Sequence, residues 1–287
     1  MPDLNKPATE TRQVGLRVQR TLAYGESERP PRWYLWEGGF LAIGQAGGEV
    51  PPHAHHAIQI FIAIEGAVAM RAAGGASREG RGIIVRADVD HSFHPQGATG
   101  AMLFVDPESP EGAWLQSALT EDITLVPDAR VDKCADALRT FWERPLEAME
   151  VADLVRHCVR ALCAGAPPTR RIDPRIATVL SAIRDSDDLR MSLEAAAALV
   201  HLSPGRFAHL FKDELGLPFR RYMLWRKLMR AMLAISREPT VAAAAHSADF
   251  ADAAHLTRTC HQMFGIPPSV MMRGRFFRVP SPFTGST

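Results

Sequence analysis

The sequence predicts an α+β protein of two domains, a β-rich N-terminal domain with flanking helices and an all-α C-terminal domain. Short aromatic and aliphatic runs bounded by glycine and proline occupy residues 17–107, as expected for strands. Apolar residues recur at helical spacing from residue 108 onward. A capped pair of helices near residue 200 is repeated closer to the C-terminus. The length of 287 residues, 46% of them hydrophobic, allows a core in each domain.

Residues 203–216, SPGRFAHLFKDELG, predict a helix with a defined beginning and end. Ser203 is a favourable N-cap, Pro204 suits the first helical position, and Gly216 followed by Pro218 ends the helix. One face is apolar and consists of Phe207, Leu210, Phe211 and Leu215. The opposite face is small or basic, as a helix in a DNA groove requires, and consists of Gly205, Arg206, Ala208, His209 and Lys212.

A short alanine-rich helix over residues 193–200, capped by Ser192, precedes this helix. The turn over 201–203 fits a helix-turn-helix, although an ordinary buried hairpin explains one such pair equally well. The pair recurs, because a shift of 49 residues places Ser203 on Asp252, Gly216 on Gly265, Pro218 on Pro267 and 193–196 on 242–245. Two such units, with a helix over 220–235 between them, suit successive major grooves roughly 34 Å apart.

These motifs resemble a known family. The run LSP-x-x-F-x-x-x-F-K from Leu202, the G-x-P at Gly216, and the later DF-x-D-x-x-H-x-x-R and FG-x-P-P-S are similar to the DNA-binding domain of AraC/XylS transcription regulators over residues 173–275. Three positions depart from the family pattern: Asp249 stands where Gly is usual, Cys260 where Phe is usual, and His261 where Lys or Arg is usual. The departures do not change the assignment.

The resemblance implies DNA-reading positions on both helices. In the first unit we expect base or phosphate contacts from the small and basic face of 203–216. In the second unit the matching positions are Ala253, Ala254, His255, Thr257 and Arg258, of which Arg258 is the strongest candidate. Basic residues on the linking helix either clamp phosphates or stay solvated: Arg220, Arg221, Arg226 and Lys227.

Charge is unevenly distributed along the chain. The residues from 170 onward hold 17 Lys and Arg against 10 Asp and Glu, whereas the first 169 hold 16 against 22. A basic C-terminal half suits DNA phosphates. The polar N-terminus and the lack of a long apolar run predict a cytoplasmic protein without a membrane segment. The four cysteines form no CxxC pair and are expected to be reduced and mostly buried.

Histidines gather in the N-terminal half. The segment 47–66, GGEVPPHAHHAIQIFIAIEG, places His53 and His55 two residues apart, hence on one side of a strand, followed by Gln59 and a buried strand over 60–64. The segment 80–95, GRGIIVRADVDHSFHP, adds His91 from a later strand. His56 and His94 are expected to be exposed or in loops.

This spacing resembles the cupin barrel. Gly47, His53, His55, Gln59 and Gly66 match its first motif, G-x5-H-x-H-x3-E-x6-G, with Gln59 in place of Glu. The second motif, G-x5-P-x-G-x2-H-x3-N, is met at two positions only, Gly80 and His91. The resemblance implies a cupin-like β-barrel over residues 17–107 that serves as an effector-sensing domain, with His53, His55, Gln59 and His91 at the effector site.

Two interpretations of the histidines remain open. Three imidazoles, His53, His55 and His91, with an amide oxygen suit Zn²⁺, Ni²⁺ or Fe²⁺. Alternatively, the site is a relic pocket whose histidines bond one another or an organic effector, because the loss of the Glu carboxylate removes a charge that attracts a cation.

The remaining segments complete the expected organisation. Helical spacing over 114–119, 131–142 and 147–163 predicts helices that cover the core or serve a homodimer. In chain order we expect a disordered N-terminus (1–16), the barrel (17–107), the helical extension (108–164), a linker (165–172), the double helix-turn-helix domain (173–278) and a tail (279–287).

The leading functional hypothesis is a bacterial transcription regulator, not an enzyme, whose DNA binding responds to a small molecule or metal ion. Double-stranded DNA, the effector and RNA polymerase are the expected partners. The alternative is a metal-dependent cupin dioxygenase or isomerase with a helical appendage. The missing Glu and the duplicated helix-turn-helix argue against this alternative.

Overall fold

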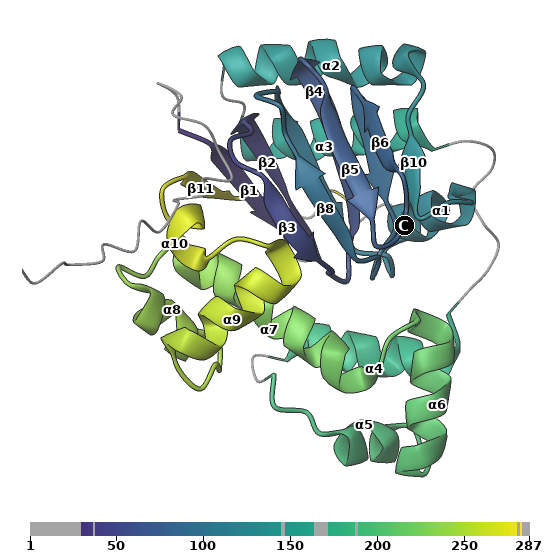
Figure 1. The fold of residues 1–287 in the computed structure, drawn as a ribbon. Coiled ribbons are helices and arrows are strands. Elements are labelled where there is room, and N and C mark those ends of the chain that lie inside the picture. The colour runs from purple at the N-terminus through teal and green to yellow at the C-terminus, as the bar shows by residue number, and fades with distance from the viewer. Residues whose placement is uncertain are drawn as a thin grey trace, which may run out of the picture.

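The computed structural model describes residues 30–36, 38–144, 147–163, 172–186, 189–279 and 282. The expectations for residues 1–16, for the first part of the barrel, for most of the linker and for most of the tail lie outside these residues. Ten strands, paired antiparallel in two sheets, and three helices come first in the chain, and a group of helices follows (Figure 1). The final strand returns to the N-terminal sheet.

Strands β1 to β10 and the final β11 form a seven-stranded and a four-stranded sheet. The seven-stranded sheet has the order β10-β7-β4-β9-β2-β1-β11 and the four-stranded sheet the order β3-β8-β5-β6. The bounds are β1 Arg32–Trp36, β2 Gly39–Gln45, β3 Val50–His53, β4 Ile58–Glu65, β5 Val68–Ala72, β6 Ser77–Gly80, β7 Gly82–Val85, β8 His91–His94, β9 Thr99–Val105, β10 Ile123–Leu125 and β11 Arg275–Arg278.

The expected closed barrel is therefore wrong, since the two sheets do not join into one. The edge strand β1 pairs with β11 from the far end of the chain, so this edge is not available to close against β3. The aromatic and aliphatic residues of β1 and β2 form two strands that pair with each other antiparallel. The buried strand expected over 60–64 is confirmed as part of β4.

Helices cover one face of the seven-stranded sheet. They are α1 (Pro110–Ala118), α2 (Asp128–Glu143) and α3 (Ala148–Leu162), close to the helices expected from the sequence. Side chains of β4 such as Ile58, Ile60 and Ile62 pack with Leu138 of α2 and Val155 of α3 in one core cluster. Cysteines 134, 158 and 260 are buried free thiols, as expected, and Cys163 is half-buried.

The C-terminal helices form two helix pairs on either side of a long helix. The bounds are α4 Pro174–Asp185, α5 Leu193–Leu199, α6 Pro204–Leu215, α7 Phe219–Ile235, α8 Val241–Ser247, α9 Ala253–Phe264 and α10 Pro268–Met271. In Figure 1, α5 and α6 lie beside one end of α7, and α8 and α9 lie beside the other end. No helix in the described part of the chain is long and apolar enough to cross a membrane.

The two helix pairs differ in what they pack against. The pair α5–α6 shares a core with α4 and the first turns of α7, built around Phe207, Phe211 and Phe219. The pair α8–α9 shares a core with the β domain, in which Phe264 packs with Phe40 and other residues of the sheets. The second pair therefore shares the core of the β domain, and the first pair does not.

Strand β11 ties the second pair to the sheet further. It runs parallel to β1, with Trp33 opposite Phe276 and Tyr34 opposite Phe277. Phe276 stacks on Trp33 at 5.8 Å and Phe277 on Tyr34 at 4.9 Å between ring centroids. These residues were expected at the end of the DNA-binding domain, and nothing in their sequence indicates this pairing.

Candidate functional site

The first candidate DNA-reading helix, α6, begins and ends as its sequence predicts. The Ser203 hydroxyl accepts from the amide of Arg206 at 3.4 Å, and Gly216 ends the helix at a φ of 82°. Phe207 and Phe211 are fully buried on one face. The candidate contact residues lie on the opposite face: Gly205, Arg206, His209 and Lys212 are exposed, and Ala208 is half-buried.

The second candidate helix, α9, repeats this design. Asp252 caps it through a 2.6 Å bond from the amide of His255, and Gly265 ends it at a φ of 68°. Ala254 and Arg258 are exposed, whereas Ala253, His255 and Thr257 are half-buried. The Thr257 hydroxyl donates to the Ala253 carbonyl at 2.7 Å. Arg206 and Arg258 are both exposed to solvent, and DNA reading by both helices requires this exposure.

The two helix-turn-helix units are not related by one constant shift along the chain. The amides of Leu202 and Phe250 bond the carbonyls of Ala197 and Ala245, which relates the α5 and α8 turns by 48 residues. The matching of 193–196 with 242–245 is therefore wrong by one position. The caps Ser203 and Asp252 keep the shift of 49, because the second turn is one residue longer.

The basic residues of α7 are not all available to contact DNA phosphates. Arg220 is exposed, but the guanidinium of Arg221 lies 3.9 Å from a carboxylate oxygen of Asp88 in the β domain. Lys227 donates to the carbonyl of Asp249 at 3.4 Å. Arg221 and Lys227 therefore hold protein segments together in this structure, and Arg220 is the better candidate for a phosphate.

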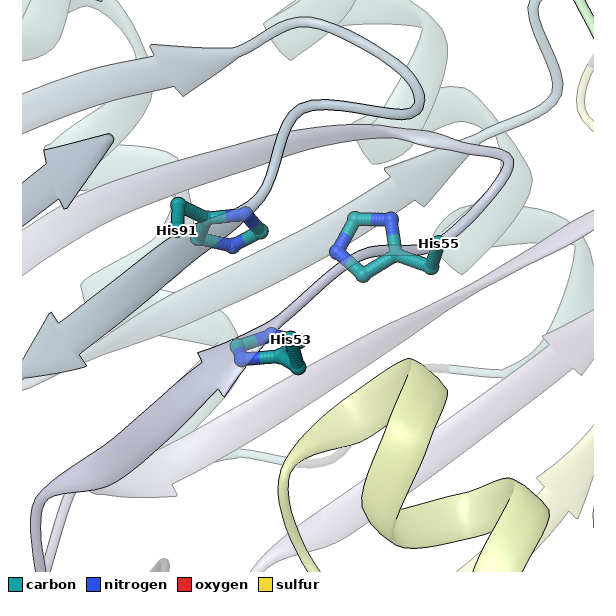
Figure 2. A group of neighbouring side chains, drawn as sticks. All are labelled: His53, His55 and His91. Atoms are coloured by element: carbon teal, nitrogen blue, oxygen red, sulfur yellow. The ribbon is translucent and has the colours of Figure 1, made fainter. Parts of the chain in front are cut away.

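Three histidines converge in the β domain, as Figure 2 shows. His53 ends β3, His91 begins β8 directly opposite it, and His55 comes from the loop before β4. One nitrogen of each ring lies within 4.8 Å of those of the others, and all three side chains are buried. The oxygen of the Gln59 amide lies 2.8 Å from Nε2 of His55 and 3.1 Å from Nε2 of His91.

Hydrogen bonds fix the tautomer of these rings. Each Nδ1 lies 2.9–3.1 Å from a backbone carbonyl oxygen, which can only accept, so each Nδ1 carries the proton. Burial lowers the pKa of all three imidazoles, that of His91 to about 3, and neighbouring rings lower it further at His55 and His91. Three neutral rings therefore direct the lone pairs of Nε2 toward one another.

This arrangement fits a divalent cation. Neutral imidazoles whose second nitrogen is held by a carbonyl are the usual form of histidine ligands. The Gln59 oxygen faces two lone pairs, which repel it unless a cation lies between them or the amide NH₂ turns toward the rings. The donor set of three nitrogens and one oxygen suits Zn²⁺, Ni²⁺ or Fe²⁺.

An apolar pocket of about 50 Å³ adjoins His53 and Gln59. Its walls come from both sheets, with Trp33, Phe61, Met102 and Phe104 among them. The second helix-turn-helix unit closes it, because Phe264, Ile266 and Met271 also line the pocket. The Phe264 ring lies 6.3 Å from that of His55, and the amide of Ala54 donates to the carbonyl of Gln262 at 3.3 Å.

His56 is not exposed, which corrects the expectation from sequence. It is 2% exposed and bonds Asp88 and Glu108 through its two ring nitrogens, each at 2.6 Å. Burial lowers its pKa, but the carboxylates outweigh burial and raise the pKa to about 10. Its ring lies 5.7 Å from that of Tyr222 on α7. The ionic cluster of His56, Asp88 and Glu108 lies within the β domain and contacts the first turns of α7 through Tyr222 and Arg221.

Sequence reasoning missed this cluster because its members carry no motif and lie up to 52 residues apart. His94, by contrast, is partly exposed, as expected, with 31% of its side chain accessible.

Comparisons with known proteins agree with this architecture. A family profile described as a helix-turn-helix domain matches residues 196–274. The crystal structure of ToxT from Vibrio cholerae O395 is similar, with a TM-score of 0.53 and 10% identity over 78% of this chain and 92% of that one. ToxT from the same source bound to (E)-4-(8-methylnaphthalen-1-yl)but-3-enoic acid has a TM-score of 0.51 and 10% identity over 82% and 97%. No curated protein matches the chain.

The profile match shows a helix-turn-helix domain within residues 196–274, the part of the chain that holds α6, α7, α8 and α9. The similarity to ToxT concerns the fold, a β-rich N-terminal domain followed by a helical domain. The helix-turn-helix match favours the regulator hypothesis over a cupin enzyme with a helical appendage.

Proposed function

We propose that the chain binds specific DNA sequences through α6 and α9, and that an occupant of the histidine pocket controls this binding. The observation that carries the proposal is the position of the second unit. Its helix α9 exposes Ala254 and Arg258 at one end and closes the pocket with Phe264 at the other end. A change in the pocket therefore acts directly on a DNA-reading helix.

The size of the pocket distinguishes two kinds of occupant. A cavity of about 50 Å³ is far smaller than the roughly 300–1,000 Å³ of common ligand sites. A cation between His53, His55 and His91 fits without movement of the second unit. An organic effector of the kind bound to ToxT, an aromatic carboxylic acid, fits only when Phe264 and Met271 move away.

The mechanism follows as a shift between two populations. In the closed state, α9 is held by the sheet core, by the backbone bond from Ala54 and by β11. A cation on the three histidines stabilises this state, because His53 lies beside Gly265 at the end of α9. An organic effector stabilises an open state, in which α9 changes its angle to α6. The two occupants therefore have opposite effects on the second unit.

Binding to DNA is tested by selection of duplexes from a random pool, followed by titration of a selected duplex at several salt concentrations. If six to ten phosphates are contacted, affinity falls by roughly 10³- to 10⁵-fold between 50 and 200 mM salt. Replacement of Arg206 or Arg258 by Ala lowers specific affinity, and replacement of exposed Arg78 on the β domain does not. Failure to select any duplex would contradict the proposal.

Occupation of the pocket is tested by elemental analysis of the gently purified protein, together with mass spectrometry for organic ligands. We expect Zn, Ni or Fe at about one equivalent in the wild-type protein and loss of this metal in His53→Ala and His91→Ala. His94→Ala is the matched control, because its ring lies outside the three-histidine group. Binding of an organic molecule without metal would instead favour the relic-pocket interpretation.

A further inference from the structure

The turn of the second helix-turn-helix unit contains a strained residue. Asp249 has a φ of 58°, in the left-handed region that favours glycine. The resemblance described above places Gly at this position in the family. His201, at the equivalent place in the first turn, has a φ of 55°, so both turns need this backbone conformation. An aspartate there costs some conformational energy that glycine does not.

The Asp249 side chain contacts two arginines. One carboxylate oxygen accepts from Nε and Nη2 of Arg190 at 3.1 and 2.8 Å. The other oxygen lies 3.7 Å from the guanidinium of Arg230 on α7. The Asp249 carbonyl accepts from Lys227, also on α7. The hydrogen bond from Arg190 lowers the pKa of Asp249, which keeps the carboxylate ionised at neutral pH.

These contacts join the two helix-turn-helix units. Arg190 lies just before Ser192, the cap of α5, and therefore belongs to the first unit. Asp249 lies in the turn between α8 and α9 and is only 20% exposed. The pair bridges 59 residues of the chain. Along the chain, the two reading helices are connected through α7 and α8. The ion pair adds a non-covalent link between the two units.

We propose that Arg190 and Asp249 form a clamp that fixes the angle between the two units and so sets the spacing of the half-sites that the protein reads. The clamp rests on the proposed DNA binding by α6 and α9. Asp249 is a positioning residue in this scheme, since its carboxylate contacts Arg190 and Arg230.

The test uses the full chain and a duplex selected by the wild-type protein from a random pool. Affinity is measured on this duplex and on one with an extra base pair between the half-sites, which rotates them by roughly 34° about the DNA axis. The variants are Asp249→Asn, which tolerates the same backbone region, Asp249→Gly, which removes the strain, and Arg190→Ala. Asp213→Asn on α6 is the charge-matched control, because it also removes one negative charge from the domain.

We expect the wild type and Asp213→Asn to discriminate strongly between the two duplexes. Asp249→Asn, Asp249→Gly and Arg190→Ala should bind the original duplex about fivefold more weakly and discriminate less. The double variant Arg190→Ala with Asp249→Asn should be no weaker than either single variant, because all remove one interaction. Binding to a single half-site should not change in any of them.

Unchanged spacing discrimination in Asp249→Asn and Arg190→Ala would overturn the clamp and leave the proposed function standing. Additive losses in the double variant, or equal losses on a single half-site, would also overturn it. Failure of the wild type to select any duplex would overturn the proposed function, and the clamp with it.

Discussion

The two helix-turn-helix units share one design but differ in their attachment to the β domain. The first unit, α5 and α6, packs on α4 and the beginning of α7, and its core is built from C-terminal residues. The second unit, α8 and α9, packs into the core of the β domain, closes the histidine pocket and continues into β11. The β domain therefore shares a core with the second unit and not with the first.

The contacts that the sensor makes with the two ends of α7 also differ in kind. Toward the second unit the contact is apolar, because Trp225 and Leu228 of α7 share the core cluster of the β domain. Toward the first unit it includes an ion pair, in which Arg221 of α7 lies 3.9 Å from Asp88, itself bonded to His56. Burial of apolar surface is insensitive to pH, whereas an ion pair responds to pH. The two ends of α7 are therefore held by forces that can be changed separately.

The largest effect should come from Phe264→Ala. Its ring contacts those of Phe40, Phe104 and Trp225, so we expect a loss of about 3–5 kcal/mol in the free energy of unfolding. Hydrogen exchange should increase in α9 and also in β3, because the two pack together. Phe211→Ala is the matched control, with exchange rising in α4 to α7 alone. Increased exchange of β3 in Phe211→Ala would contradict the comparison.

A smaller effect should come from removal of β11. A chain that ends at Gly274 loses the stacks of Phe276 and Phe277 and the burial of Val279, so we expect destabilisation by about 1–3 kcal/mol. A chain that ends at Val279 keeps the strand and serves as the control. Amide exchange of β1 should rise in the shorter chain only, and equal exchange in both would show that β11 does not hold the second unit.

The ionic contact of His56 predicts that the free energy of unfolding decreases as pH rises above 6.5. The folded-state pKa of His56 is raised to about 10 from 6.5, so its contribution to stability is fully present below pH 6.5 and is lost as pH rises through 10. Thermal unfolding from pH 7 to 10 should show this loss in the wild type and a flatter curve in His56→Gln. Parallel curves for the two proteins would contradict the charged state of His56.

The histidine pocket predicts the opposite pH dependence of stability, a loss as pH decreases. Its imidazoles have folded-state pKa values below 6.5, that of His91 about 3, so stability is present above pH 6.5 and falls as pH decreases toward 3. In His91→Gln, the loss of stability at acid pH should be smaller than in the wild type. Bound metal should dissociate as pH falls from 6.5 toward 3. Metal that stays bound at pH 4 would argue against imidazole ligands.

Local features of the chain were predictable from sequence because local physics determines them. The caps at Ser203 and Asp252 and the left-handed glycines Gly216 and Gly265 follow from residue type and spacing. The convergence of His53, His55 and His91 followed from a motif, even though the sheets do not close into the expected barrel.

Long-range features were not predictable, because their partners are far apart in the chain. Nothing in the segment RFFR identifies β1, some 240 residues away, as the strand it pairs with. The burial of His56 depends on Glu108, which carries no motif. The sequence does not show that the turn between α8 and α9 is one residue longer than the turn between α5 and α6. The caps and the C-terminal glycines of α6 and α9 still align at a shift of 49 residues.

A hydroxyl-radical footprint of the wild type and of Phe264→Ala on a selected duplex tests the account most directly. We expect two protected regions about one helical turn apart for the wild type, and weakening of one region only in Phe264→Ala. A single protected region for the wild type, or equal weakening of both regions in the variant, would contradict a second unit that links the sensor to DNA.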